Sequence, residues 1–155
     1  MRALARFIAT LGPVGSFPVA PATGASAITA LAGYFLPALA VPVALLLILL
    51  GAALAVWAAG AAEATLGHDA RPIVIDEVIG QSLALLFVPR TPLAFLAAFV
   101  LFRGFDVWKP LGAYEAQRLP GGWGVVADDV IAGLTACGAF HLGVWALGRL
   151  GLHIV

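Results

Sequence analysis

The stretch that decides the fold is A-L-A-V-P-V-A-L-L-L-I-L-L-G-A-A-L-A-V-W-A-A-G, residues 38–60, which contains no charged side chain. A helix needs about 20 apolar residues to cross the hydrocarbon core of a bilayer, and this run is long enough. A second uncharged run, residues 130–148, is nearly as long. The two runs together predict a protein that is integral to a membrane.

The composition favours the same class of protein. Of the 155 residues, 63% are hydrophobic and 10% are charged, whereas soluble domains have about 25% charged residues. The mean hydropathy is +1.07, which excludes a disordered chain. Eight basic and eight acidic side chains give a net charge of zero, which argues against a nucleic-acid partner. With one cysteine, Cys137, neither an intrachain disulfide nor a cysteine-rich metal site is expected.

Shorter apolar runs lie at residues 24–36, 78–89 and 91–102. Pro37, Pro89 and Pro92 separate them and predict corners between helices. Twelve helical residues are only about 18 Å long, so these helices are expected to be short, tilted or re-entrant. The expected fold is all-α, with residues 1–155 forming one membrane-embedded bundle of short and long helices.

The polar residues gather in three segments, at 11–26, 67–77 and 103–129. If the chain returns to the same membrane face between them, the three segments meet at one polar site. Six basic residues then share the face of the site and two lie on the opposite face. The six are Arg2, Arg6, Arg71, Arg103, Lys109 and Arg118, and the two are Arg90 and Arg149. The positive-inside rule therefore predicts that the site faces the cytoplasm.

Two pairs of neighbouring acids, Asp76-Glu77 and Asp128-Asp129, are the candidate metal ligands. Each pair is expected to open a helix, so the simpler alternative is that they only cap helices and interact with the helix dipole. However, unpaired charge next to lipid is costly, and oxygen ligands favour a hard cation such as Mg²⁺. A Mg²⁺ site is therefore favoured over capping alone. Adjacent helical residues point about 100° apart, so each pair is expected to supply one ligand and one supporting or proton-accepting group.

Arg103, Asp106 and Lys109 are spaced by three residues along one predicted helix. They fit either an interfacial stripe of salt bridges or recognition of a phosphate by the two basic side chains, with Asp106 orienting them or binding metal. Thr23 and Ser26 lie where a Pro/Gly loop leads into a helix. They can cap that helix or belong to a helix start that binds phosphate.

Four sequence blocks, taken in order, resemble the phosphatidylglycerophosphatase A family of bacterial membrane lipid phosphatases. They are G-S-F-P-V-A-P-A-T at residues 15–23, I-V-I-D-E-V-I-G at 73–80, F-R-G-F-D-V-W-K-P at 102–110, and G-G-W-G-V-V-A-D-D-V-I-A-G at 121–133. The resemblance extends over residues 11–134. The chain departs from the family pattern A-P-G-T-x-G-S, because Ala22 and Ala25 occupy the glycine positions.

The resemblance implies an all-helical fold and Mg²⁺-dependent hydrolysis of phosphatidylglycerophosphate to phosphatidylglycerol and inorganic phosphate, at the cytoplasmic face of the bacterial inner membrane. The metal ligands and their supports would be Asp76, Glu77, Asp128 and Asp129, and the phosphate would meet Thr23, Ser26, Arg103 and Lys109. Water would attack the phosphorus. Asp106 stays open between a ligand, an orienting group and a nucleophile.

Three alternatives remain at this point. The substrate can be another lipid phosphate, such as phosphatidic acid or a prenyl phosphate. The carboxylates can instead bind a cation carried by a small transporter, although no internal repeat is visible. The chain can also be a membrane partner protein without catalysis. His68, beside Asp69, is interpreted as a polar loop residue rather than a proton shuttle.

Overall fold

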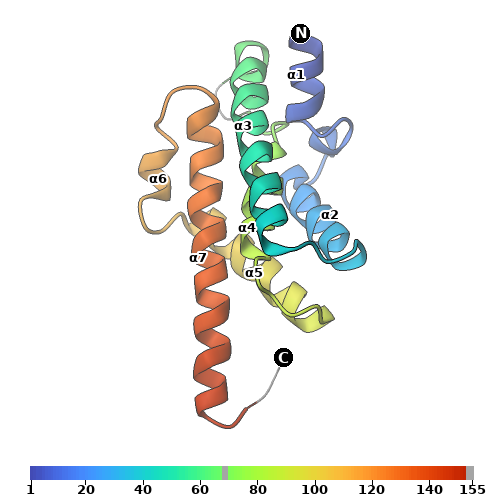
Figure 1. Ribbon diagram of the computed structural model, residues 1–155. Helices are drawn as coiled ribbons and strands as arrows, with labels where there is room; N and C mark the ends of the chain where they lie inside the picture. Colours follow the sequence, from blue (N-terminus) through green and yellow to red (C-terminus); the bar gives the residue numbers. More distant parts are fainter. Residues whose placement is uncertain (68–69, 153–155) are drawn as a thin grey trace.

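The computed structural model describes residues 1–67 and 70–152, so His68 and Asp69 lie outside the described part of the chain. The described residues form only helices and connecting loops, which confirms the all-α prediction (Figure 1). The elements are α1 (Arg2–Ala9), η1 (Val14–Ser16), α2 (Pro21–Phe35), α3 (Val41–Leu66), α4 (Ile75–Ala84), α5 (Pro92–Trp108), α6 (Ala113–Ala116) and α7 (Gly122–Arg149).

Two of these helices, α3 and α7, are long and apolar enough to cross a membrane. They have 26 and 28 residues, about 39 and 42 Å of helix, against a hydrocarbon core of about 30 Å. Large apolar side chains on α3, including Leu45, Leu49 and Leu50, are exposed. In Figure 1 the C-terminal end of α7 extends beyond the other helices. These features indicate that the protein is associated with a membrane.

The short helices turn at the predicted corners. Helix α5 begins at Pro92, and the hydroxyl of Thr91 caps it by accepting a hydrogen bond from the amide of Ala94 at 3.2 Å. Just before this cap, Arg90 donates to the main-chain oxygens of Tyr34 and Leu36 at the end of α2. The corner between α4 and α5 is thereby held against the end of α2.

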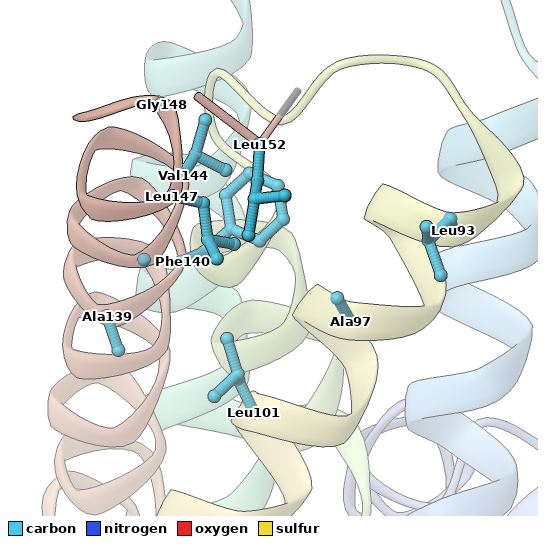
Figure 2. A pocket seen from close by; sticks show the side chains of 10 residues that line it. Leu93, Ala97, Leu101, Ala139, Phe140, Val144, Leu147, Gly148 and Leu152 are labelled. Atoms are coloured by element: carbon cyan, nitrogen blue, oxygen red, sulfur yellow. The ribbon is translucent and has the colours of Figure 1, made fainter. Parts of the chain in front are cut away.

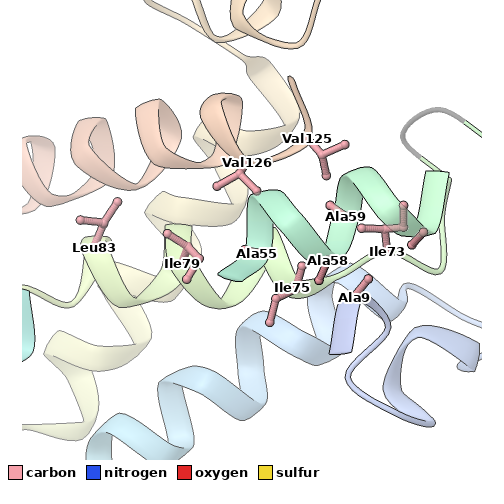
Figure 3. Close-up of a cluster of buried hydrophobic side chains, with 11 residues drawn as sticks. Ala9, Ala55, Ala58, Ala59, Ile73, Ile75, Ile79, Leu83, Val125 and Val126 are labelled. Carbon is pink, nitrogen blue, oxygen red and sulfur yellow. The ribbon is translucent and has the colours of Figure 1, made fainter. Parts of the chain in front are cut away.

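Helix α4 lies at the centre of the bundle and packs against α2, α3, α5 and α7. Figure 3 shows the largest buried cluster, in which small residues of α3 such as Ala55, Ala58 and Ala59 face Ile79 of α4 and Val126 of α7. Alanine and glycine at such contacts let helix backbones approach closely. The helices of the core therefore pack with their backbones close together. Helix α4 contacts each of the other helices that line the polar cavity.

The prediction that Asp128-Asp129 opens the last helix is wrong. Helix α7 begins at Gly122, so both acids lie inside it. A glycine costs about 1 kcal/mol in a helix, so the glycine-rich residues before the two acids disfavour a helix by local preference. Close packing overrides that preference, since a Cβ on Gly122 would lie 2.0 Å from the main-chain oxygen of Val56 in α3. The contact holds the first turn of α7 against α3.

Candidate active site

One cavity of about 370 Å³ lies where α2 and α4 begin, α5 ends and α7 passes. All five carboxylates predicted from the sequence line it, together with three basic side chains and the first turn of α2. The carboxylates are Asp76, Glu77, Asp106, Asp128 and Asp129, and the basic side chains are Arg71, Arg103 and Lys109. The tertiary structure thus brings the three polar segments of the sequence to one site.

Glu77, Asp106 and Asp129 form the tightest acidic cluster among the described residues. One carboxylate oxygen from each lies within 4.8 Å of the other two. Glu77 and Asp129 are buried, with 5% and 2% of their surface exposed. Three carboxylate oxygens at this separation can hold a metal ion, and hard cations prefer such ligands.

A backbone contact one turn farther along the helices brings Glu77 and Asp129 together. Gly133 of α7 meets Gly80 of α4 so closely that a Cβ on Gly133 would lie 2.3 Å from the main-chain oxygen of Gly80. Glu77 precedes Gly80 by three residues and Asp129 precedes Gly133 by four, which is about one helical turn in each case. The short distance between Glu77 and Asp129 therefore depends on the contact of Gly80 with Gly133.

Each acidic pair contributes one member to the cluster of three carboxylates. Glu77 and Asp129 belong to it, while Asp76 and Asp128 line the same cavity outside it. Asp106 completes this cluster, so its position is compatible with a ligand, which is one of the three roles left open by the sequence. Asp76 and Glu77 lie in the first turn of α4, where acids interact well with the helix dipole, but neither side chain caps that helix.

Glu77 joins three helices through its side chain. Ser26 of α2 donates a hydrogen bond to Glu77 Oε2 at 2.9 Å, and Arg103 of α5 forms an ion pair with Glu77. Arg103 also lies 3.0 Å from Asp106 Oδ2. Burial raises the pKa of the Glu77 carboxyl and the neighbouring Arg103 opposes that increase. Charge-assisted hydrogen bonds of this kind hold a carboxylate in a fixed orientation.

Lys109 and Asp128 form a second ion pair, between the end of α5 and the second turn of α7. Lys109 has a left-handed backbone conformation, with φ of 51°, and it follows the last residue of the helix. Arg103 and Lys109 thus form salt bridges to other helices, while the pair of Arg103 with Asp106 lies within α5. Both basic side chains that the sequence assigned to phosphate are engaged with carboxylates.

The two hydroxyl residues predicted to contact phosphate occupy different positions. Thr23 lines the cavity in the first turn of α2. Ser26 is completely buried behind it and contacts Glu77, so it supports the carboxylate. Arg71 was not selected as a site residue from the sequence, but it lines the cavity. The feature of the sequence that could have indicated Arg71 is its position in the polar segment just before Asp76-Glu77.

The carboxylates fit a resident cation. Asp129 Oδ2 is buried and has no hydrogen-bond partner among residues 1–67 and 70–152. Leaving a buried carboxylate oxygen without a partner is costly, and a metal ion bound to the triad would remove that cost. Glu77, Asp106 and Asp129 are therefore suited to bind a divalent cation.

A second cavity of similar volume, about 360 Å³, has different chemistry (Figure 2). It lies between α5 and α7 and is lined by apolar residues such as Leu93, Leu101 and Phe140. No charged side chain lines it among the described residues, so it offers no group for an anion. Of these two cavities, only the polar one is lined by charged side chains.

Carboxylates that can hold a cation beside arginine and lysine suit reactions of phosphate esters, and the exposed apolar helices suit a lipid substrate. The fold and the site are thus suited to a helical membrane protein that acts on the phosphate of a lipid. Residues 7–144 match the sequence model of the family described as phosphatidylglycerophosphatase A. The chain belongs to this family, and the resemblance seen in the four sequence blocks is confirmed.

Three relatives show the range of names among similar proteins. Phosphatidylglycerophosphatase A of Escherichia coli K12 is 32% identical over 88% of this chain and 82% of its own length. Phosphatidylglycerophosphatase A of Haemophilus influenzae is 41% identical over 44% of each chain. A Bacteroides thetaiotaomicron protein, provisionally named a phosphatidylinositol-3-phosphatase, is 38% identical over 60% of each chain. The last two matches span less than two thirds of those relatives. No solved structure matches this chain.

Proposed function

We propose that this protein hydrolyses the terminal phosphomonoester of phosphatidylglycerophosphate, releasing phosphatidylglycerol and inorganic phosphate. The observation that carries the proposal is the triad of Glu77, Asp106 and Asp129, with Arg103 and Lys109 in the same cavity. Family membership and the name of the E. coli relative, which matches most of this chain, support the choice of lipid.

Mg²⁺ is the proposed cofactor, held by Glu77, Asp106 and Asp129, because oxygen ligands and a phosphate substrate suit it. When bound, Mg²⁺ would neutralise phosphate charge and would favour deprotonation of the attacking water. Arg103 fixes Glu77 and Asp106 through their ion pairs. Asp76 and Asp128 are proposed to support the cluster and to accept the proton of the attacking water. The oxygen of that water bonds to phosphorus as the bond to the glycerol oxygen breaks, and the released alkoxide takes up a proton.

The proposed location is the bacterial inner membrane, with several crossings and the site on the cytoplasmic side. Two apolar helices support membrane placement. The six basic residues that the sequence assigns to the polar face, against two on the other, support the orientation. A phospholipid headgroup would then lie at the level of the carboxylates.

A second candidate substrate is phosphatidylinositol 3-phosphate, which is favoured only by the name of the Bacteroides relative. It carries a phosphomonoester on a ring hydroxyl, so the same carboxylates could act on it. The difference between the two lipids lies in the size of the headgroup that the cavity must admit.

The proposal is tested by phosphate release from phosphatidylglycerophosphate in detergent micelles, with phosphatidic acid and phosphatidylinositol 3-phosphate in parallel. Phosphatidylglycerophosphate is expected to have the highest kcat/KM. Chelation with EDTA is expected to reduce its hydrolysis by about 100-fold or more, because the metal contributes several kcal/mol to the transition state. Added Mg²⁺ is expected to restore it.

Each contrary outcome has a defined meaning. A higher kcat/KM for either comparison lipid would contradict the substrate assignment and leave the site in place. Unchanged hydrolysis after complete removal of divalent metal would contradict the metal assignment. A phospho-aspartate trapped on Asp106 would contradict direct attack by water.

A further inference from the structure

The three basic residues of the polar cavity differ in their ion-pair and hydrogen-bond partners. Arg103 is paired with Glu77 and Asp106, and Lys109 is paired with Asp128. Their charges already compensate carboxylates of the site. A phosphate arriving in the cavity would have to compete with those carboxylates for either side chain.

Arg71 has a neutral partner. Its Nη2 donates a hydrogen bond to the main-chain oxygen of Pro18 at 2.7 Å. Within residues 1–67 and 70–152, no carboxylate forms a salt bridge with it. A guanidinium carries five N–H donors, so four remain after the bond to Pro18. The side chain is exposed and lines the cavity, so its charge is accessible to an anion there.

The bond to Pro18 also places the guanidinium at a defined wall of the cavity. Pro18 lies in the loop just before α2, whose first residues Pro21, Ala22 and Thr23 line the same cavity. Arg71 comes from the loop before α4. The hydrogen bond therefore joins two walls of the cavity and limits the motion of a long side chain, which reduces the entropy lost when an anion binds.

We propose that Arg71 is the residue that binds the phosphoryl group of the lipid substrate, and later the inorganic phosphate product, through its remaining N–H groups. This inference rests on the proposed function. It changes the expectation from the sequence, which assigned phosphate to Arg103 and Lys109. Those two residues orient the carboxylates, and Arg71 supplies a positive charge that forms no salt bridge with the carboxylates in the described part of the chain. Arginine suits this role because its planar fork matches two phosphate oxygens.

The direct test is the affinity for inorganic phosphate, titrated by calorimetry in detergent with saturating Mg²⁺. Arg71→Gln is expected to weaken phosphate binding about tenfold or more, the size of one lost hydrogen bond to a charged group. Arg71→Lys is expected to fall between Arg71→Gln and the wild type, because it keeps the charge and loses the fork. The matched control is Arg118→Gln, since Arg118 stacks on Tyr114 outside the lining of the cavity.

The kinetic readout separates binding from a merely structural role. Arg71→Gln is expected to raise KM for the lipid about tenfold, with kcat changed by less than about twofold. A structural role of the bond to Pro18 would instead lower kcat and the affinity for Mg²⁺. If Arg71→Gln binds inorganic phosphate as tightly as Arg118→Gln does, or if only kcat and Mg²⁺ affinity fall, the inference is wrong.

Failure of this inference is distinguishable from failure of the proposed function. If the wild type does not hydrolyse phosphatidylglycerophosphate, the substrate proposal fails, and the phosphate titration still decides the role of Arg71. If the wild type hydrolyses this lipid and Arg71→Gln matches it in KM and phosphate affinity, only the inference about Arg71 fails.

Discussion

Asp129→Asn is expected to reduce phosphate release from phosphatidylglycerophosphate by about 1,000-fold. The substitution keeps the shape of the side chain and removes one negative charge from the triad with Glu77 and Asp106. A bound metal stabilises a phosphoryl transition state by several kcal/mol, and each 1.4 kcal/mol corresponds to a factor of ten in rate. The measurement is kcat/KM at saturating Mg²⁺, compared with the wild type.

The matched control is Glu115→Gln, the same change of a carboxylate to an amide, on an exposed residue of α6. It is expected to leave kcat/KM unchanged, because Glu115 lies outside the lining of the cavity. Asp129→Asn with the rate of the wild type and an ordinary Mg²⁺ dependence would contradict the assignment of this residue to the metal.

Thermal unfolding gives a readout of the metal site that does not depend on turnover. A cation that binds only the folded protein raises its Tm, so Mg²⁺ is expected to raise the Tm of the wild type and of Glu115→Gln. The rise should be absent in Asp129→Asn. Without Mg²⁺, Asp129→Asn is expected to be at least as stable as the wild type, because three crowded carboxylates repel one another. A large loss of stability without metal would indicate a structural role for Asp129.

Gly133→Ala is expected to destabilise the fold by about 3 kcal/mol and to abolish hydrolysis. The added methyl would lie 2.3 Å from the main-chain oxygen of Gly80, and a backbone atom cannot turn aside as a side chain can. Helices α4 and α7 must then separate, at a cost typical of severe overpacking. The separation also moves Glu77 away from Asp129, because each lies about one turn from the contact.

The control for this prediction is Gly138→Ala on the same helix, where a Cβ meets no atom within 4 Å. It is expected to be neutral or slightly stabilising, because alanine is favoured over glycine in helices by up to about 1 kcal/mol. The two variants are compared by thermal unfolding in detergent, followed by circular dichroism, and by phosphate release. A loss of about 3 kcal/mol lowers the Tm of a chain of this size by roughly 6–12 °C. Equal Tm values for the two variants would contradict the close contact of α4 and α7.

The helices were predictable from the sequence, while several of their ends were not. Helix α3 contains all but the first three residues of the uncharged run 38–60, and α7 contains the whole run 130–148. The sequence places the start of the last helix at Asp128-Asp129, but α7 begins at Gly122, in a glycine-rich segment whose local preference is for turns. Packing of Gly122 against Val56 of another helix overrides the local preference. Local helix propensity contains no information about a contact with another helix.

The sequence predicts which residues line the site better than it predicts what each of them contacts. Every carboxylate named from the sequence lines the cavity, because acids beside apolar helices are costly and are kept where they have partners. Ser26 and Lys109 were assigned to phosphate, yet each contacts a carboxylate. These partners come from other helices, and helical spacing carries no information about them.

The sequence by itself determined that this protein is helical, apolar and supplied with a polar site, because hydrophobic run length and the position of charges are properties of the chain. Only the tertiary structure decided which carboxylates meet. The contact of Gly80 with Gly133 brings Glu77 and Asp129 beside Asp106, and α5 carries Arg103 to two of the three. The physical reason is that the meeting of side chains depends on the distance and rotation between helices, which close packing of small residues fixes in three dimensions.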